Sequence, residues 1–130
     1  MNADDKRGTP RGTREVLEAH LKCRQSGDLD GDIRDNYHSD VALLSAEGVH
    51  HGTEAVRALA GVLRRYLPDG DYRYRQVLTR GEVGMLIWSG RCADTDTEVH
   101  DGVDSYVVHD GRIVAQTIHY ATAPLTEHPV

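Results

Sequence analysis

The sequence contains only two cysteines, no long apolar run and no excess of positive charge. Cys23 and Cys92 lie far apart and form no C-x-x-C pattern, which excludes a disulfide framework and a cysteine-based zinc site. No stretch approaches the roughly 18 apolar residues of a membrane-spanning helix. The segment from Met1 to Arg7 lacks the apolar stretch of a secretory signal. We therefore expect a cytoplasmic protein with no membrane partner, whose cysteines are small buried side chains.

The charge balance is acidic. The chain has 15 Lys and Arg against 21 Asp and Glu, which gives a net charge of −6 at pH 7. Nucleic-acid binding needs a concentrated positive field. The basic residues here are dispersed, and the densest groups are Arg64 with Arg65 and Arg73 with Arg75. The sequence therefore predicts no nucleic-acid partner.

The motifs of several common sites are also missing. His50 and His51 are adjacent and point to opposite faces of an extended strand, and no H-x-x-x-H spacing occurs among the eight histidines. Ser45, Ser89 and Ser105 lack the context of a nucleophile elbow, and there is no glycine-rich phosphate loop. We expect no metal, no nucleotide and no other cofactor.

A chain of 130 residues corresponds to one domain, because a single core commonly serves about 100–200 residues. Residues 1–12 are polar and without periodicity, and we expect them to form a flexible N-terminal arm. Residues 122–130 have no pattern either and are expected to form a C-terminal tail. The folded domain is therefore predicted to span residues 13–121.

Apolar spacing predicts three helices and six strands. Thr13, Asp28 and Thr53 are the expected N-caps of the helices, and Tyr37 continues the apolar face of the second one. Helices are expected at 13–26, 28–37 and 53–67, and strands at 40–45, 49–51, 72–79, 83–89, 98–109 and 113–120. This order predicts an α+β fold, a cone-shaped barrel with the helices packed on one face of a strongly curved, mainly antiparallel sheet. The interior of such a cone is a natural pocket for a hydrophobic small molecule.

The strand at 83–89 is almost continuously apolar, so we expect both of its faces to be covered. Helices cover only one face of the predicted sheet. A second copy of the chain is the simplest cover for the other, which predicts a homodimer through the convex sheet face. Association with a different protein through this face is the alternative.

Three stretches, at residues 26–40, 52–59 and 102–114, together with the element order, resemble the nuclear-transport-factor-2-like superfamily. The resemblance is to its SnoaL-like and ketosteroid-isomerase-like members and covers roughly residues 13–121. It implies the cone-shaped fold described above. It implies less about the reaction, because this superfamily hosts isomerases, cyclases, dehydratases and plain binding domains.

The sequence departs from the catalytic patterns of these relatives. Similarity to ketosteroid isomerases implies that Asp104 is a hydrogen-bond donor and that His20 stands where a tyrosine donor is found. Ser45 then stands where the general-base aspartate is expected and cannot replace it. Similarity to SnoaL-type cyclases places Ile118 at the position of their aspartate, unless the register shifts by one residue and His119 takes the role.

His20 and Asp104 are the candidate catalytic residues. A carboxylate on an apolar strand face must be protonated, hydrogen-bonded or paired. His20 lies on the apolar face of the first helix, and a neutral imidazole oriented by a carboxylate is a competent general base. We expect the two side chains to face each other across the cone. Purely structural roles, as a satisfied core histidine and a bonded carboxylate, remain the alternatives.

Further residues are expected to contact the ligand. If buried, the Tyr37 hydroxyl needs a partner, for which His20 is one option, and Gln116 is a polar anchor in an apolar cavity. The predicted ligand-contacting set comprises Tyr37, Ser45, Trp88, Tyr106, Gln116 and Ile118.

The sequence thus predicts a cofactor-free enzyme that uses acid–base chemistry on a polyketide- or steroid-like carbonyl compound, as an isomerase, cyclase or dehydratase. A non-catalytic small-molecule-binding or dimerisation domain of the same fold is the alternative, favoured by Ser45 and Ile118 at the two departures from the family patterns.

Overall fold

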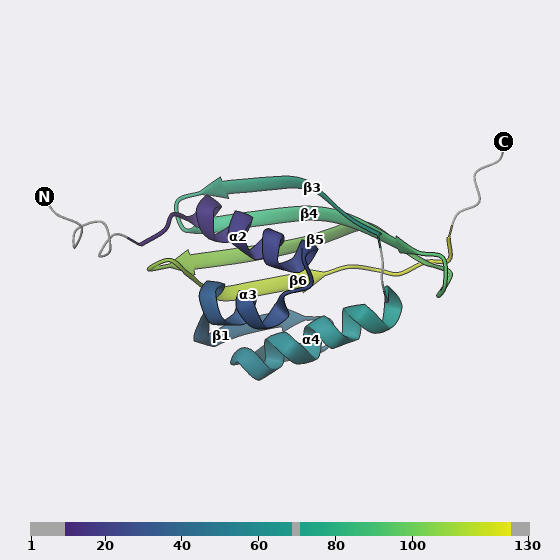
Figure 1. Cartoon of the computed structure of the whole chain (residues 1–130), viewed down its shortest axis with the longest axis horizontal. Coiled ribbons are helices and arrows are strands. Elements are labelled where there is room, and N and C mark those ends of the chain that lie inside the picture. The colour runs from purple at the N-terminus through teal and green to yellow at the C-terminus, as the bar shows by residue number, and fades with distance from the viewer. Residues whose placement is uncertain (1–9, 69–70, 126–130) are drawn as a thin grey trace, which may run out of the picture.

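The computed structural model describes residues 10–68 and 71–125, in which the chain forms three helices and six strands (Figure 1). The helices are α2 (Thr13–Gln25), α3 (Leu29–Asn36) and α4 (Thr53–Tyr66). The strands are β1 (Tyr37–Ser45), β2 (Gly48–His51), β3 (Asp71–Arg80), β4 (Val83–Cys92), β5 (Thr97–His109) and β6 (Arg112–His119). Residues 1–9 of the predicted arm and 126–130 of the predicted tail lie outside the described residues.

The six strands form one mixed sheet in the order β2-β1-β6-β5-β4-β3. Its one parallel pair is β1 with β6, and the other neighbours are antiparallel. The sheet is curled but not closed, so β2 and β3 are its edges. The predicted α+β class, with three helices on a mainly antiparallel sheet, is confirmed.

The helices cover the concave face of this sheet (Figure 1). Helix α2 packs over β3, β4 and β5, whereas α3 and α4 lie over the β1 end. Between the layers lies a core of buried side chains, among them Val16, Leu17, Val41, Leu43 and Ile113. Burial of such apolar surface, worth about 25 cal/mol per Å², drives the packing of the helices onto the sheet.

Two of the three predicted N-caps differ from the structure. Asp28 caps α3 as expected, with its carboxylate accepting from the Gly31 N–H at 2.9 Å. Gly12 and Gly52 are the caps of α2 and α4. The Thr13 hydroxyl instead donates to the Gly81 carbonyl at 2.6 Å, because a tertiary partner is available to it.

The sequence prediction also misplaced Tyr37, which begins β1 rather than ending the second helix. Asn36 ends α3, and the backbone of Tyr37 is already extended. At the other end of the domain, Arg11 was expected in the flexible arm. Its guanidinium donates to the Asn36 side chain at 3.0 Å and to the Gly111 carbonyl at 2.9 Å, which ties the start of α2 to the β5–β6 turn.

Local backbone signals position the long strands. Asp110 and Gly111 both have positive φ values, of 49° and 76°, as a two-residue turn between β5 and β6 requires. The β4–β5 register shifts near Gly102, where the chain forms a bulge. A side chain at Gly102 would collide with the indole of Trp88, so this glycine allows Trp88 to lie flat over β5.

Candidate active site

A cavity of about 830 Å³ lies between the helices and the concave face of the sheet. Its apolar walls include Leu43, Val56, Leu63 and Leu86, and aromatic rings come from Tyr72, Tyr74, Trp88 and Tyr120. The polar groups that reach it include His20, Arg24, Tyr37, Asp104 and Gln116. A mostly apolar pocket with a few convergent polar groups is the usual form of a small-molecule site.

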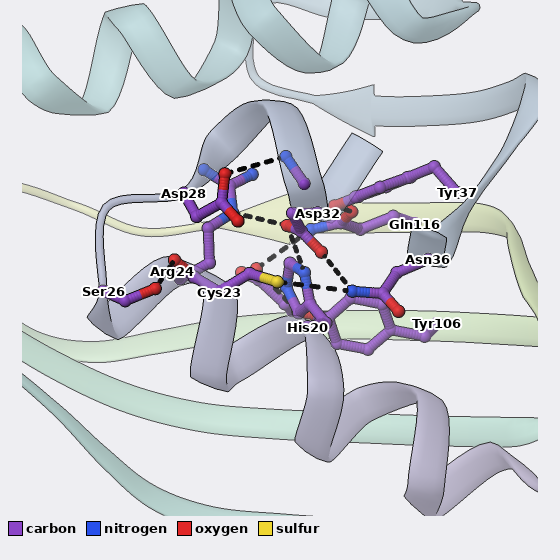
Figure 2. Close-up of polar contacts among 12 residues, drawn as sticks. His20, Cys23, Arg24, Ser26, Asp28, Asp32, Asn36, Tyr37, Tyr106 and Gln116 are labelled. Carbon is purple, nitrogen blue, oxygen red and sulfur yellow. Dashed lines mark hydrogen bonds and ion pairs between the residues drawn. The ribbon is translucent and has the colours of Figure 1, made fainter. Parts of the chain in front are cut away.

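His20 pairs with Asp32 below this cavity (Figure 2). The His20 Nδ1 atom lies 2.8 Å from Asp32 Oδ2, and Asp32 has no solvent exposure. The same oxygen accepts from Arg24 Nε at 3.0 Å, and the Asn36 amide donates to Asp32 Oδ1 at 2.8 Å. Asp32 thus has hydrogen-bond partners on both oxygens.

These partners determine the charge of Asp32. Burial alone would raise the pKa of this carboxyl. The hydrogen bond and charge of His20, the Asn36 hydrogen bond and the charge of Arg24 together outweigh burial and hold the Asp32 pKa below its usual value. Asp32 is therefore ionised, and His20 Nδ1 must carry a proton to donate to it.

The other nitrogen of His20 faces Tyr106. His20 Nε2 lies 3.2 Å from the Tyr106 hydroxyl, and the two rings meet edge to face with centroids 5.5 Å apart. The same hydroxyl lies 3.3 Å from Asp104 Oδ2. Tyr106 is 2% exposed and is absent from the cavity walls, so it lies beneath the site and bridges His20 and Asp104.

Asp104 is the carboxyl that reaches the cavity. Trp88 Nε1 donates to Oδ1 at 3.2 Å, and Gln116 Nε2 donates to Oδ2 at 3.2 Å. Asp104 is partly buried and lines the cavity. Burial raises the Asp104 pKa, and the donors and the charge of His20 only partly offset this effect. Asp104 thus holds a proton more readily than an exposed aspartate does.

Tyr37 and Gln116 complete the polar wall. The Tyr37 hydroxyl donates to Gln116 Oε1 at 2.6 Å, which fixes the Gln116 amide with its nitrogen toward Asp104. The hydrogen bond from Tyr37 to His20, which the sequence offered as one option, is therefore not formed. The Tyr37 ring instead meets the His20 ring edge to face at 5.7 Å. Burial raises the Tyr37 pKa, so this phenol stays protonated.

The structure brings most of the predicted site residues together, with two corrections. Tyr106 was expected to contact the ligand, but it lies behind the cavity wall. Ser45 lines a separate, smaller cavity of about 280 Å³. Ile118 lines both cavities and pairs with Asp104 across β5 and β6, so His119 pairs with Val103 instead and cannot take its place.

Asp32, Arg24 and Asn36 belong to this hydrogen-bonded group but were not among the predicted site residues. A signal for them exists, because His20 and Arg24 are four residues apart on α2, and Asp32 and Asn36 are four apart on α3. Each pair therefore lies on one face of its helix. The spacing does not specify how the two helices pack, so it does not show by itself that the two pairs meet.

The described part of the chain contains no group of three or more His, Cys, Asp or Glu side chains arranged to hold a metal ion. Within the described ranges, no helix has both the length and the apolar character needed to cross a membrane.

The comparison with known families agrees with this architecture. Residues 17–116 match the SnoaL-like domain, so the chain belongs to the SnoaL-like family. No curated protein matches the chain.

Solved structures share the fold at low sequence identity. An NTF-2-like protein of unknown function from Burkholderia xenovorans LB400 superposes with a TM-score of 0.69 at 19% identity, covering 90% of this chain and 87% of that one. TerC, which was co-crystallised with polyporic acid, gives a TM-score of 0.68 at 16% identity, with 84% and 91% covered. A candidate SnoaL-like polyketide cyclase from Mesorhizobium loti gives 0.57 at 20% identity, with 82% and 97% covered.

Proposed function

We propose that this protein is an enzyme whose cavity performs acid–base chemistry on a carbonyl compound, in an isomerisation, cyclisation or dehydration. The observation that carries the proposal is Asp104, a carboxyl of raised pKa at the wall of an apolar cavity. Carboxyls perturbed in this way cluster at catalytic sites, because general acids and bases work best when their pKa lies near the working pH.

The chemistry proposed for Asp104 is a proton transfer at carbon. Its carboxylate takes a proton from a carbon next to the ligand carbonyl, the C–H bond breaks, and the electron pair moves to the carbonyl oxygen as an enolate. The protonated carboxyl then returns the proton to a different carbon or to a leaving oxygen. Gln116 and Trp88 hold the carboxyl through both steps, since each donates to it.

The walls of the cavity support a large ligand with aromatic or polycyclic character. A volume of about 830 Å³ lies within the range of roughly 300–1,000 Å³ that drug-sized ligands occupy. Rings of Tyr72, Trp88 and Tyr120 offer flat apolar faces, and Trp88 lies between the other two, at 6.1 and 5.7 Å between centroids. Co-crystallisation of the structurally similar TerC with polyporic acid supports a ligand of this size.

The test incubates purified wild-type protein and an Asp104→Asn variant with small-molecule extracts, followed by untargeted mass spectrometry. Asp101→Asn is the matched control, because Asp101 lies on the same strand but is exposed and 3.8 Å from Arg75. We expect a compound that wild type and D101N convert and D104N spares. Equal conversion by D104N would remove Asp104 from the mechanism.

A second candidate function is binding without catalysis. Ser45 and Ile118 favour it, because neither supplies the carboxylate expected at its position, and Ser45 lies outside the main cavity. A compound that co-purifies with both proteins and is released unchanged would establish this reading and leave His20 and Asp104 with structural roles.

We also propose that a second copy of the chain covers the convex sheet face. Leu44, Leu78, Val83 and Val107 are 43%, 43%, 59% and 37% exposed there, and Val83 pairs directly with Val107. The same patch on two copies allows a closed two-fold interface. Val83→Arg is expected to give monomers in analytical ultracentrifugation, whereas Ala58→Arg on the exposed face of α4 is not. A wild-type monomer would contradict this proposal.

A further inference from the structure

The side chains of His20, Tyr106 and Asp104 form one continuous chain of hydrogen bonds. Tyr106 has a single O–H, yet it lies within hydrogen-bond distance of both His20 Nε2 and Asp104 Oδ2. It can donate to only one of them and must accept from the other. The direction in which Tyr106 donates therefore depends on where the neighbouring protons are.

The surrounding contacts leave two arrangements. Asp32 accepts from Nδ1, so only Nε2 of His20 can gain or lose a proton within the chain. Gln116 donates to Asp104 Oδ2, so the position through which this oxygen can share a proton within the chain is the one toward Tyr106. In the first arrangement Asp104 is protonated and donates to Tyr106, which donates to neutral His20. In the second, protonated His20 donates to Tyr106, which donates to the Asp104 carboxylate.

The two arrangements contain the same number of protons. We propose that Asp104, Tyr106 and His20 share one mobile proton, which the Tyr106 hydroxyl carries between the cavity carboxyl and the buried imidazole. As the O–H bond of Asp104 breaks, a new O–H bond forms at Tyr106. The original Tyr106 proton moves to His20 Nε2, which leaves a carboxylate and an imidazolium. No electron transfer and no co-reactant is involved.

The surroundings of His20 and Asp104 allow either group to hold the mobile proton. The imidazolium faces the Asp32 carboxylate, whose second cationic partner is Arg24, while the rings of Tyr37 and Tyr106 enclose it from β1 and β5. Burial and the nearby Asp104 raise the Tyr106 pKa well above its usual value, so the bridge stays a neutral phenol. Asp104 can thus pass its proton to, or regain it from, a group inside the protein. Tyr106 is a positioning residue, because it does not reach the cavity.

The inference rests on the proposed function only for its use in turnover, and its test needs no substrate. Protein labelled with ¹⁵N-histidine and ¹³C-aspartate is titrated with acid and base, and NMR follows the His20 imidazole nitrogens and the Asp104 carboxyl carbon. Groups that share a proton titrate as a pair with common macroscopic midpoints. We expect both nuclei of wild type to change in the same two steps.

Two tyrosine variants locate the bridge. Tyr106→Phe keeps the ring against His20 and removes the hydroxyl, which leaves only the charge interaction between His20 and Asp104. The two midpoints are then expected to move apart, and each nucleus is expected to change mainly in one step. Tyr72→Phe is the control, since the Tyr72 hydroxyl donates to the Leu67 carbonyl and not to a member of the chain. It should keep the two shared steps. Single unrelated steps in wild type, or steps in Y106F shared to the same extent as in wild type, would overturn the relay.

Titration and conversion experiments together distinguish the proton relay from the proposed enzymatic activity. Shared titration in a protein that converts no compound would leave the relay standing and remove the proposed function. Conversion that depends on Asp104, with independent titrations, would do the reverse. Once a substrate is known, Y106F is expected to lower kcat by about 10²-fold or more, with KM little changed, since proton transfers of this kind contribute about 10²–10⁴-fold.

Discussion

His20 Nδ1 lies 2.8 Å from the Oδ2 atom of Asp32, a carboxylate with no exposed surface. The pair joins α2 to α3 and determines which imidazole nitrogen faces the strands. A carboxylate hydrogen bond of this kind fixes the histidine tautomer. The orientation of His20 therefore depends on a residue that does not reach the ligand cavity.

Removing this carboxylate is expected to be costly. Asp32→Asn leaves the Arg24 guanidinium and the His20 N–H facing an amide, and breaking one partner of a buried pair typically costs about 3–5 kcal/mol. Chemical denaturation measures the loss in free energy of unfolding. Asp35→Asn on the same helix is the control, because the Asp35 side chain is exposed and pairs with Arg34. Equal stability of D32N and wild type would contradict the buried pair.

The pKa of Asp32 also predicts an acid dependence. Because the folded-state pKa lies below the usual value of 3.8, the ionised carboxylate stabilises the fold above that pH. This stabilisation is lost as the pH falls from 3.8 through the folded-state value. The free energy of unfolding of wild type should therefore converge toward that of D32N in this window. A constant difference down to the acid limit would contradict the shift.

Asp104 predicts the opposite dependence. Its folded-state pKa is raised, so the protonated carboxyl makes its full contribution to the free energy of unfolding below pH 3.8. This contribution is lost as the pH rises through the folded-state pKa. Asp104→Asn removes that loss. From acid to neutral pH, the free energy of unfolding of D104N should therefore rise progressively relative to that of wild type. Asp101→Asn, which replaces an exposed carboxylate, provides the baseline, and a pH-independent difference would disprove the raised pKa.

The contact between Gly102 and Trp88 gives a prediction about the cavity wall. Gly102→Ala places a methyl group against the indole, and such overpacking typically costs about 1–3 kcal/mol. Trp88 is the only tryptophan of the chain, so its fluorescence reports the displacement directly. Gly61→Ala is the control, since nothing lies within 4 Å of the added methyl, and it should stabilise α4 by about 0.5–1 kcal/mol. An unchanged Trp88 spectrum in G102A would contradict the contact.

Local patterns in the sequence determined the elements of this fold. Alternation along β5 assigned Asp104 and Tyr106 to one face, and helical spacing placed His20 on the apolar side of α2. The cap at Asp28 and the turn at Asp110–Gly111 can be predicted from the sequence, because each depends only on residues next to it in the chain. These features need only contacts between residues close together in the chain.

The partners of those residues were decided by tertiary structure alone. Asp32 meets His20 because α2 and α3 pack at a particular angle, and no local pattern specifies that angle. Tyr106 shares a face with Asp104, but the packing of α2 over β5 directs its hydroxyl to His20 rather than into the cavity. Ser45 lies in the second cavity, where Leu59, Val62 and Tyr66 of α4 form part of the wall. Alternation specifies the face on which a side chain lies, whereas the element packed against that face decides what the side chain contacts.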